Sequence, residues 1–158
     1  MTPTEAETLF NEHARSIHAA VYRLTLDAAA ADDATQEAFV RLLQSPPPVT
    51  DNIAAWLKRV AVNFAIDVLR RQARVIALDG KDFEQAETSE RDVGDDMLRA
   101  LKRLEPDQRA AVLAIDRDGM AYQDAARLLG VHVNKLRTDL CRGRRALFEV
   151  LKEKRAAG

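Results

Sequence analysis

Apolar residues recur along this chain at the three- and four-residue spacing of an amphipathic α-helix, and no stretch shows the alternation of a half-buried strand. The first helix is predicted to begin at Pro3, because Thr2 can serve as its N-cap and Glu5 can complete a capping box. It should run to about residue 25. Its predicted apolar face consists of Phe10, Ile17, Val21 and Leu24.

A second and a third helix are predicted on either side of a proline-rich loop. The loop has the sequence SPPPVTDN over residues 45–52, and three consecutive prolines cannot continue a helix. Asp51 stands where it can cap the third helix, which should end in the basic cluster at residues 70–74. The apolar positions of the second helix are Ala34, Ala38, Phe39, Leu42 and Leu43. Those of the third helix are Ile53, Trp56, Leu57, Val60, Phe64, Val68 and Leu69.

Residues 75–95 interrupt the helical pattern. This acidic segment, VIALDGKDFEQAETSERDVGD, follows neither a helical nor a strand period, so we expect a flexible linker. Further helices are predicted at about 96–104, at 106–117 with Pro106 in the first turn, at 122–129 and at 132–154. The predicted fold is all-α, with two small helical domains, residues 1–74 and 96–158, joined by the acidic linker 75–95.

Charge is unevenly distributed, although the net charge of the whole chain is only −1. Residues 72–96 carry a net charge of −5, and residues 97–158 carry a net charge of +6. A basic carboxyl-terminal domain behind an acidic segment indicates a module that binds a polyanion.

Composition argues against several classes of protein. No apolar run approaches the roughly 20 residues that a membrane span needs, and the amino terminus lacks the basic and apolar regions of a signal peptide. Cys141 is the only cysteine, so no disulfide within the chain and no cysteine zinc site is expected. The sequence offers no carboxylate pair, His/Cys cluster or glycine-rich phosphate loop. We therefore expect a cytoplasmic protein that is not an enzyme and holds no cofactor or metal.

Residues 122–147 have the arrangement of a helix-turn-helix. Ala126 precedes Gly130 by four residues, where a small side chain lets two helices approach closely. Leu136 and Leu140 should face inward, and a helix presented in this way fits the major groove of DNA. An ordinary helical hairpin with a solvated charged face is the alternative. The outward positions are Asn134, Lys135, Thr138, Asp139 and Arg142 for base edges, with Arg137, Arg144 and Arg145 placed for phosphates.

Three stretches of the chain resemble a single protein family. AYQDAARLLGVHVNKLRTDLCRGRRAL (121–147) is similar to the carboxyl-terminal DNA-binding domain of bacterial extracytoplasmic-function (ECF) sigma factors. DDATQEAFVRLL (32–43) resembles the helix with which that family binds core RNA polymerase, and AWLKRVAVNFAIDVLRRQAR (55–74) resembles its −10-element helix. The stretch NFAIDVLRR and the compact length are most similar to the subgroup that governs ferric-siderophore uptake.

The resemblance implies a sigma factor that directs core RNA polymerase to specific promoters and assists promoter opening. It implies core polymerase, promoter DNA and an anti-sigma regulator as partners, and in the siderophore subgroup that regulator is commonly membrane-anchored. The implied polymerase-binding residues are Asp33, Gln36, Glu37 and Phe39. The implied −10 DNA-binding residues are Thr50, Asn52, Lys58, Arg59, Asn63, Arg70 and Arg71. The implied −35 DNA-binding residues are His132, Asn134, Lys135, Arg137, Thr138, Arg142, Arg144 and Arg145.

The second domain departs from the family pattern at several positions. Ala121 stands where the first helix of the helix-turn-helix usually has a Ser or Thr cap, and His132 stands where the recognition helix usually begins with Ser. Lys135 and Asp139 replace the Thr and Arg that are common there, so no promoter sequence can be carried over from the family. The alternatives are a one-component helix-turn-helix regulator that does not bind core polymerase and a helical adaptor for other proteins.

Overall fold

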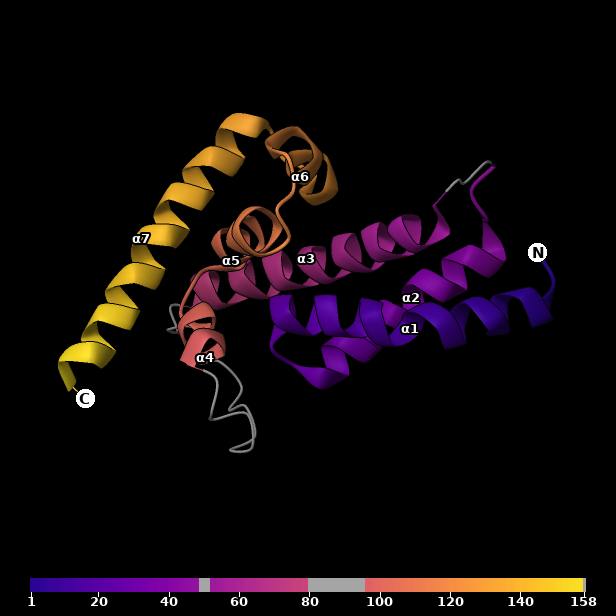
Figure 1. The fold of residues 1–158 in the computed structure, drawn as a ribbon, viewed down its shortest axis with the longest axis horizontal. Helices are drawn as coiled ribbons and strands as arrows, with labels where there is room; N and C mark the ends of the chain where they lie inside the picture. The colour runs from indigo at the N-terminus through magenta and orange to yellow at the C-terminus, as the bar shows by residue number, and fades with distance from the viewer. Residues whose placement is uncertain (49–51, 80–95, 158) are drawn as a thin grey trace. The chain divides into compact units, whose positions relative to one another are not determined.

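The computed structural model describes residues 1–48, 52–79 and 96–157, and the regular structure of these residues is helical throughout. It forms two compact units, Met1–Val68 and Leu69–Gly158. The predicted all-α fold with two helical domains is confirmed, whereas most of the predicted linker lies outside the described residues and its limits stay a prediction. The helices are α1 (Pro3–Thr25), α2 (Ala28–Gln44), α3 (Ile53–Asp79), α4 (Asp96–Lys102), α5 (Pro106–Val112), the π-helical η2 (Leu113–Arg117), α6 (Tyr122–Leu129) and α7 (Val133–Ala157) (Figure 1).

In the first unit, α1 and α2 pack side by side as a helical hairpin (Figure 1). The predicted capping box is present: the Thr2 hydroxyl accepts from the Glu5 amide at 3.2 Å, and the Glu5 carboxylate accepts from the Thr2 amide at 3.2 Å. Leu26 ends α1 in the left-handed conformation, with φ 57°. Asp27 then caps α2, because its Oδ1 accepts from the Ala29 amide at 2.9 Å.

The core of this unit combines alanines with larger apolar residues. Ala61 and Ala65 of α3 are buried, which allows a close approach between helices. The apolar stripe predicted for α3 is therefore partly wrong: Leu57 is buried, but Trp56 and Phe64 are only half-buried. The buried face of α3 is instead formed by Leu57, Ala61, Val62, Ala65 and Ile66, so the prediction placed the stripe on the wrong side of the helix in part. Two further residues predicted to face inward are exposed, Phe10 by 44% and Leu43 by 54%.

Both ends of α3 differ from the sequence-based prediction. Its cap is Asn52, whose side-chain oxygen accepts from the Ala55 amide at 3.0 Å, while the predicted cap Asp51 lies outside the described residues. At the other end the helix continues to Asp79 rather than ending near residue 74. The reason is local, since no Pro or Gly interrupts the chain between Arg74 and Gly80.

In the second unit, a buried arginine joins α4 to α5. Arg109 is only 2% exposed, and its guanidinium donates to the Leu101 carbonyl at 2.9 Å and to the Leu104 carbonyl at 3.1 Å. These carbonyls belong to the end of α4 and the turn that follows, where i to i+4 partners end. The Leu101 carbonyl also accepts from the Leu104 amide at 3.1 Å. Burial lowers the pKa of Arg109 to about 10, which leaves it charged at neutral pH.

α6 and α7 form the predicted helix-turn-helix. Gly130 has φ 66° and ends α6 in the left-handed conformation, which glycine adopts without steric cost. The Val131 amide then donates to the Ala126 carbonyl at 3.0 Å and fixes the turn. Leu136 and Leu140 are buried, as predicted from their spacing.

Candidate nucleic-acid interface

The amino-terminal half of α7 presents the polar face predicted for DNA recognition. Asn134, Lys135, Thr138 and Arg142 are exposed along it. His132 precedes the helix and caps it, because its Nδ1 accepts from the Asn134 amide at 3.1 Å. The imidazole thus caps the recognition helix at the position where the sequence resemblance led us to expect Ser. The Thr138 hydroxyl donates to the Asn134 carbonyl at 3.1 Å, so its proton is used inside the helix.

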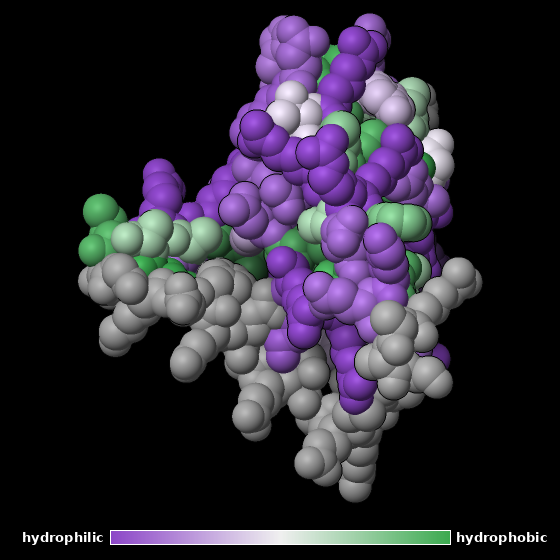
Figure 2. Space-filling view, turned by 90° about the vertical axis from the view of Figure 1, so that its left-hand side faces the viewer, coloured by the Kyte–Doolittle hydropathy of each residue, from purple (hydrophilic) through white to green (hydrophobic). Residues whose placement is uncertain are grey.

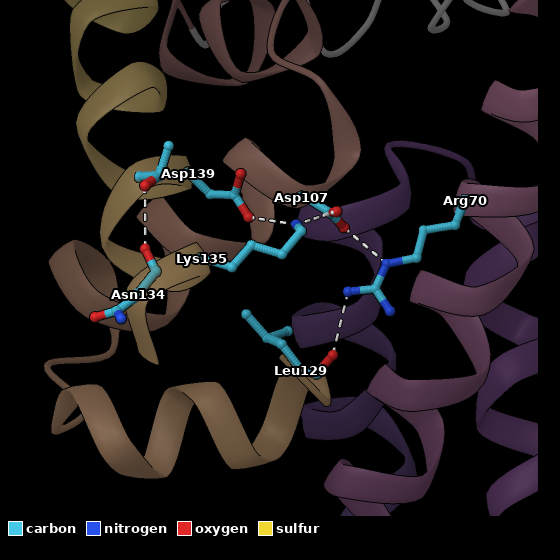
Figure 3. Close-up of polar contacts among 7 residues, drawn as sticks. Arg70, Asp107, Leu129, Asn134, Lys135 and Asp139 are labelled. Carbon is cyan, nitrogen blue, oxygen red and sulfur yellow. Dashed lines mark hydrogen bonds and ion pairs between the residues drawn. The ribbon is translucent and has the colours of Figure 1, made fainter. Parts of the chain in front are cut away.

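Lys135 lies between two carboxylates (Figure 3). Its Nζ is 2.6 Å from Oδ2 of Asp107 on α5 and 2.7 Å from Oδ2 of Asp139, one turn further along α7. Within the same unit, Asp107 also accepts from Nε of Arg70 at 2.8 Å. Arg70 donates in addition to the Leu129 carbonyl at 3.2 Å. One carboxylate therefore holds two of the side chains predicted to bind DNA.

These contacts shift the pKa of both partners. Burial acts to raise the pKa of Asp107, but hydrogen bonds from Lys135 and Arg70 outweigh it and hold the pKa below its ordinary value. Burial acts to lower the pKa of Lys135, and its hydrogen bonds to Asp107 and Asp139 raise it above the ordinary value instead. Both groups therefore stay charged across the neutral range.

The remaining basic residues of α7 differ in how firmly they are held. Arg144 forms a two-pronged ion pair with Asp116 of η2, at 2.9 Å from Nε and 2.5 Å from Nη2, and this contact raises its pKa. Arg137 lies over the Tyr122 ring, with Cζ at 5.8 Å from the ring centroid. In the described part of the chain, Arg142 and Arg145 have no hydrogen-bond or ion-pair partner.

Figure 2 colours one face of the molecule by hydropathy. Among the coloured residues of this face, hydrophilic ones predominate, with smaller apolar areas between them. A polar surface suits a phosphate backbone, and residues 97–158 carry a net charge of +6.

The residues predicted for the −10 element lie along α3. In the first unit Asn52, Arg59 and Asn63 follow at spacings of seven and four residues, which places them on one side of the helix at about 100° per residue. Asn52 and Arg59 are exposed, and Asn63 is half-buried. Lys58 is half-buried and stands about 100° away from Arg59 around the helix. Arg71 is exposed in the second unit, and Thr50 lies outside the described residues.

The residues predicted to bind polymerase do not all share one environment. Asp33 and Gln36 are exposed on α2, and Glu37 pairs with Arg41 at 3.0 Å. Phe39 is only 7% exposed, and its ring meets Phe10 edge-on at a centroid distance of 5.0 Å. Its ring therefore belongs to the core of the first unit.

Two exposed apolar side chains of α2 were missed by the sequence analysis. Val40 is 42% exposed and Leu43 is 54% exposed, and they continue the line of Asp33 and Gln36 at helical spacing. We call the four residues Asp33, Gln36, Val40 and Leu43 the α2 face. The spacing from Asp33 could have identified Val40 in the sequence, but hydropathy had assigned Leu43 to the core.

Among the described residues, no group of three or more His, Cys, Asp or Glu side chains is arranged to bind a metal ion. Every buried side-chain nitrogen and oxygen in that part of the chain has a hydrogen-bond partner. The helices that the structure describes are also too short or too polar to cross a membrane.

Comparison with known families gives two matches, in the order of the two units. Residues 9–75 match Sigma-70 region 2, and residues 94–147 match Sigma-70 region 4. The first match covers α2 and most of α3, and the second covers the helix-turn-helix.

Individual relatives agree with both matches. The chain is 31% identical to the ECF RNA polymerase sigma factor SigE of Mycolicibacterium smegmatis, over 92% of this chain and 61% of that protein. It is 32% identical to the ECF RNA polymerase sigma factor SigM of Mycobacterium tuberculosis, over 92% of this chain and 76% of that protein. Among solved structures, the sigma factor RpoE of Bartonella quintana, crystallised with the anti-sigma factor NepR, gives a TM-score of 0.67 at 25% identity. That match covers 92% of this chain and 96% of RpoE.

Proposed function

Because the chain belongs to the ECF family of RNA polymerase sigma factors, we propose that it binds core RNA polymerase, directs it to specific promoters and assists their opening. Members of this family are transcription initiation factors rather than catalytic enzymes, and the proposed role requires no bond chemistry from this chain. One observation carries the proposal: a single chain combines a helix-turn-helix of basic outer face with a separate helical unit whose α2 face is open to a partner. We also propose that the protein acts in the cytoplasm, where core polymerase works.

We propose the α2 face as the surface that docks on core polymerase. It combines a carboxylate and an amide with two apolar side chains that are about half exposed. Exposed apolar side chains rimmed by polar groups are typical of protein interfaces. Phe39 supports this face from inside the unit through its contact with Phe10, rather than by touching the partner.

A pull-down with purified bacterial core polymerase tests the docking surface. The double variant Val40→Ser, Leu43→Ser should lose at least about tenfold in affinity, because both side chains lose apolar burial in the complex. Val75→Ser is the matched control, since Val75 is 57% exposed and lies outside α2. Phe39→Ala is no substitute, because removing a buried ring destabilises the unit by roughly 3–5 kcal/mol.

The outcomes of this pull-down separate the alternatives. If the folded double variant binds core polymerase with wild-type affinity, the α2 face is not the docking surface, but the sigma-factor proposal still holds. A wild-type chain that does not bind core polymerase at all would remove the proposal itself and favour the one-component regulator.

For the −10 element, we propose that α3 and the loop before it contact the separating strands. Arg59 and Asn63 share one side of the helix with Asn52, so a basic group and two amides could follow backbone and bases together. The Asn52 side-chain oxygen is used in capping α3, which leaves its amide protons to a base. Thr50, Lys58, Arg70 and Arg71 complete the proposed set.

For the −35 element, we propose that α7 enters the major groove of the duplex. Asn134 and Arg142 are the proposed base contacts, and Arg145 is a proposed phosphate contact, since all three are exposed. His132 contributes by capping the helix, while Lys135, Arg137, Thr138 and Arg144 reach DNA only if their contacts inside the protein rearrange. Losing a base contact should change sequence preference, whereas losing a phosphate contact should weaken all duplexes alike.

We further propose that an anti-sigma protein binds and regulates this chain, because RpoE of Bartonella quintana was crystallised in complex with the anti-sigma factor NepR. Assignment to the ferric-siderophore subgroup is also a proposal, and it rests on the NFAIDVLRR stretch of α3. Measuring transcripts after induced expression of the chain tests it. Induction of iron-uptake genes is the expected result, and induction of other genes alone would exclude the subgroup.

A further inference from the structure

Asp107 is the one carboxylate outside α7 that contacts the proposed base-reading face of the recognition helix in the described part of the chain. It lies near the start of α5 and its side chain is 26% exposed. Its Oδ2 is 2.6 Å from Nζ of Lys135, and Asp139 holds the same nitrogen at 2.7 Å. Figure 3 shows the ammonium group between the two carboxylates. The positive charge of Lys135 is thus matched by acidic groups within the protein.

This pairing changes what Lys135 can offer to DNA. A basic side chain adds to DNA affinity by replacing the counterions that surround the phosphates. A side chain already paired with two carboxylates must first give up those contacts, and the carboxylates would then repel the duplex. Arg142 and Arg145, which have no partner among the described residues, meet no such cost.

The two carboxylates of the pair are not equivalent. Asp139 stands on the same helix as Lys135 and moves with it. Asp107 belongs to α5, so its contact with Lys135 depends on how α5 packs on α7. Asp107 therefore controls Lys135 from outside the recognition helix.

We propose that Asp107 is a specificity-determining residue for the −35 duplex, which withholds Lys135 from DNA and leaves recognition to Asn134 and Arg142. The inference rests on the proposed role of α7 in binding the −35 element. It predicts that the native chain contacts DNA with one fewer cation than its sequence suggests. Replacing Asp107 should leave Lys135 held only by Asp139 of its own helix, and so make part of its charge available to DNA.

The test uses holoenzyme reconstituted from the full chain and bacterial core polymerase. The probes are duplexes that the wild-type holoenzyme recovers from a pool randomised through the −35 region. Asp107→Asn keeps the shape of the side chain and removes its charge. We expect about two- to fivefold tighter binding, the range of one partly exposed ion pair, and a salt dependence steeper by about one released counterion.

Two further variants separate release of Lys135 from other causes. In a Lys135→Ala background, Asp107→Asn should bring none of the steeper salt dependence that it brings in the wild-type background. Asp124→Asn is the matched control, because Asp124 is exposed on α6 and has no partner among the described residues. It should leave the salt dependence unchanged.

Each alternative outcome contradicts a different part of the reasoning. If Asp107→Asn still steepens the salt dependence in the Lys135→Ala background, the gain comes from Arg70, the second cation held by Asp107. That result would overturn the inference. Weaker binding by Asp107→Asn, with its α7 amides protected from exchange as in wild type, would mean that Asp107 positions Lys135 for DNA, which also overturns it. Wild-type holoenzyme that selects no −35 sequence would instead contradict the proposed function.

Discussion

The substitution Gly143→Ala tests the packing of the recognition helix, because it should have two effects of opposite sign on the stability of α7. Gly143 lies within α7 and is buried against α5. A Cβ atom added at this position would stand 2.9 Å from Cγ2 of Val112 and 3.0 Å from the carbonyl oxygen of Gln108. The Val112 methyl can move slightly, but the Gln108 oxygen belongs to the backbone of α5 and cannot move alone.

The magnitude follows from these two effects. Helix propensity alone predicts that Gly143→Ala stabilises α7 by about 1 kcal/mol. Forcing an extra methyl group into a packed contact costs roughly 1–3 kcal/mol. Since the contact at 3.0 Å involves a backbone oxygen that cannot move alone, we expect the higher part of that range and a net destabilisation of about 1 kcal/mol or more.

Native-state hydrogen exchange of the α7 amides measures this change within the second unit, without assuming that the whole chain unfolds together. Cys141→Ala is the control, because Cys141 is exposed two residues earlier on the same helix and should change stability by less than about 0.5 kcal/mol. If Gly143→Ala raised the protection of α7 by the full helix-propensity gain, the close contact between α5 and α7 would be wrong.

Three further predictions concern the same unit. Ala121→Ser should stabilise it by about 0.5–1 kcal/mol in urea denaturation, because α6 has no side-chain cap; an unchanged midpoint would contradict this. Arg109→Met should destabilise it by roughly 2 kcal/mol, because the Leu104 carbonyl loses its guanidinium donor and the Leu101 carbonyl keeps only the Leu104 amide. Unchanged stability would mean that the Leu104 carbonyl finds another partner. The hydrogen bond from Arg144, opposed by partial burial, lowers the pKa of Asp116. The contribution of this ion pair to folding stability should therefore be present above the ordinary Asp pKa of about 4 and lost as the pH falls through the lowered pKa. Asp116→Asn should accordingly reduce stability at pH 6 and reduce it progressively less below pH 4. A pH-independent cost would argue against the ion pair.

The sequence predicted the elements of the fold well because their signals are local. The capping box of Thr2 and Glu5, the turn at Gly130 and the inward spacing of Leu136 and Leu140 each depend on residues within a few positions of one another. The same holds for the exposure of Asn134 and Arg142. Family resemblance added the order of the two regions, which the family matches then confirmed.

What the sequence could not predict depends on contacts between distant elements. Nothing near Lys135 indicates that Asp107 reaches it from α5, or that Arg109 satisfies the carbonyls after α4. The position of Phe39 in the motif likewise gives no sign of Phe10, whose ring meets it edge-on from α1. On α3, Val62 and Ile66 are buried while Phe64 and Trp56 are half-buried, because contacts with the other helices of the first unit, and not hydropathy alone, decide which side of the helix faces the core.

Promoter-dependent transcription in a purified system is the most direct test of the central claim. The components are the full chain, bacterial core polymerase and linear templates that carry the duplexes selected by the holoenzyme. We expect run-off transcripts only when the chain is present, and loss of these transcripts when the −35 sequence is scrambled. Core polymerase that gives the same transcripts without the chain, or a chain that yields none from any selected template, would contradict its assignment as an initiation factor.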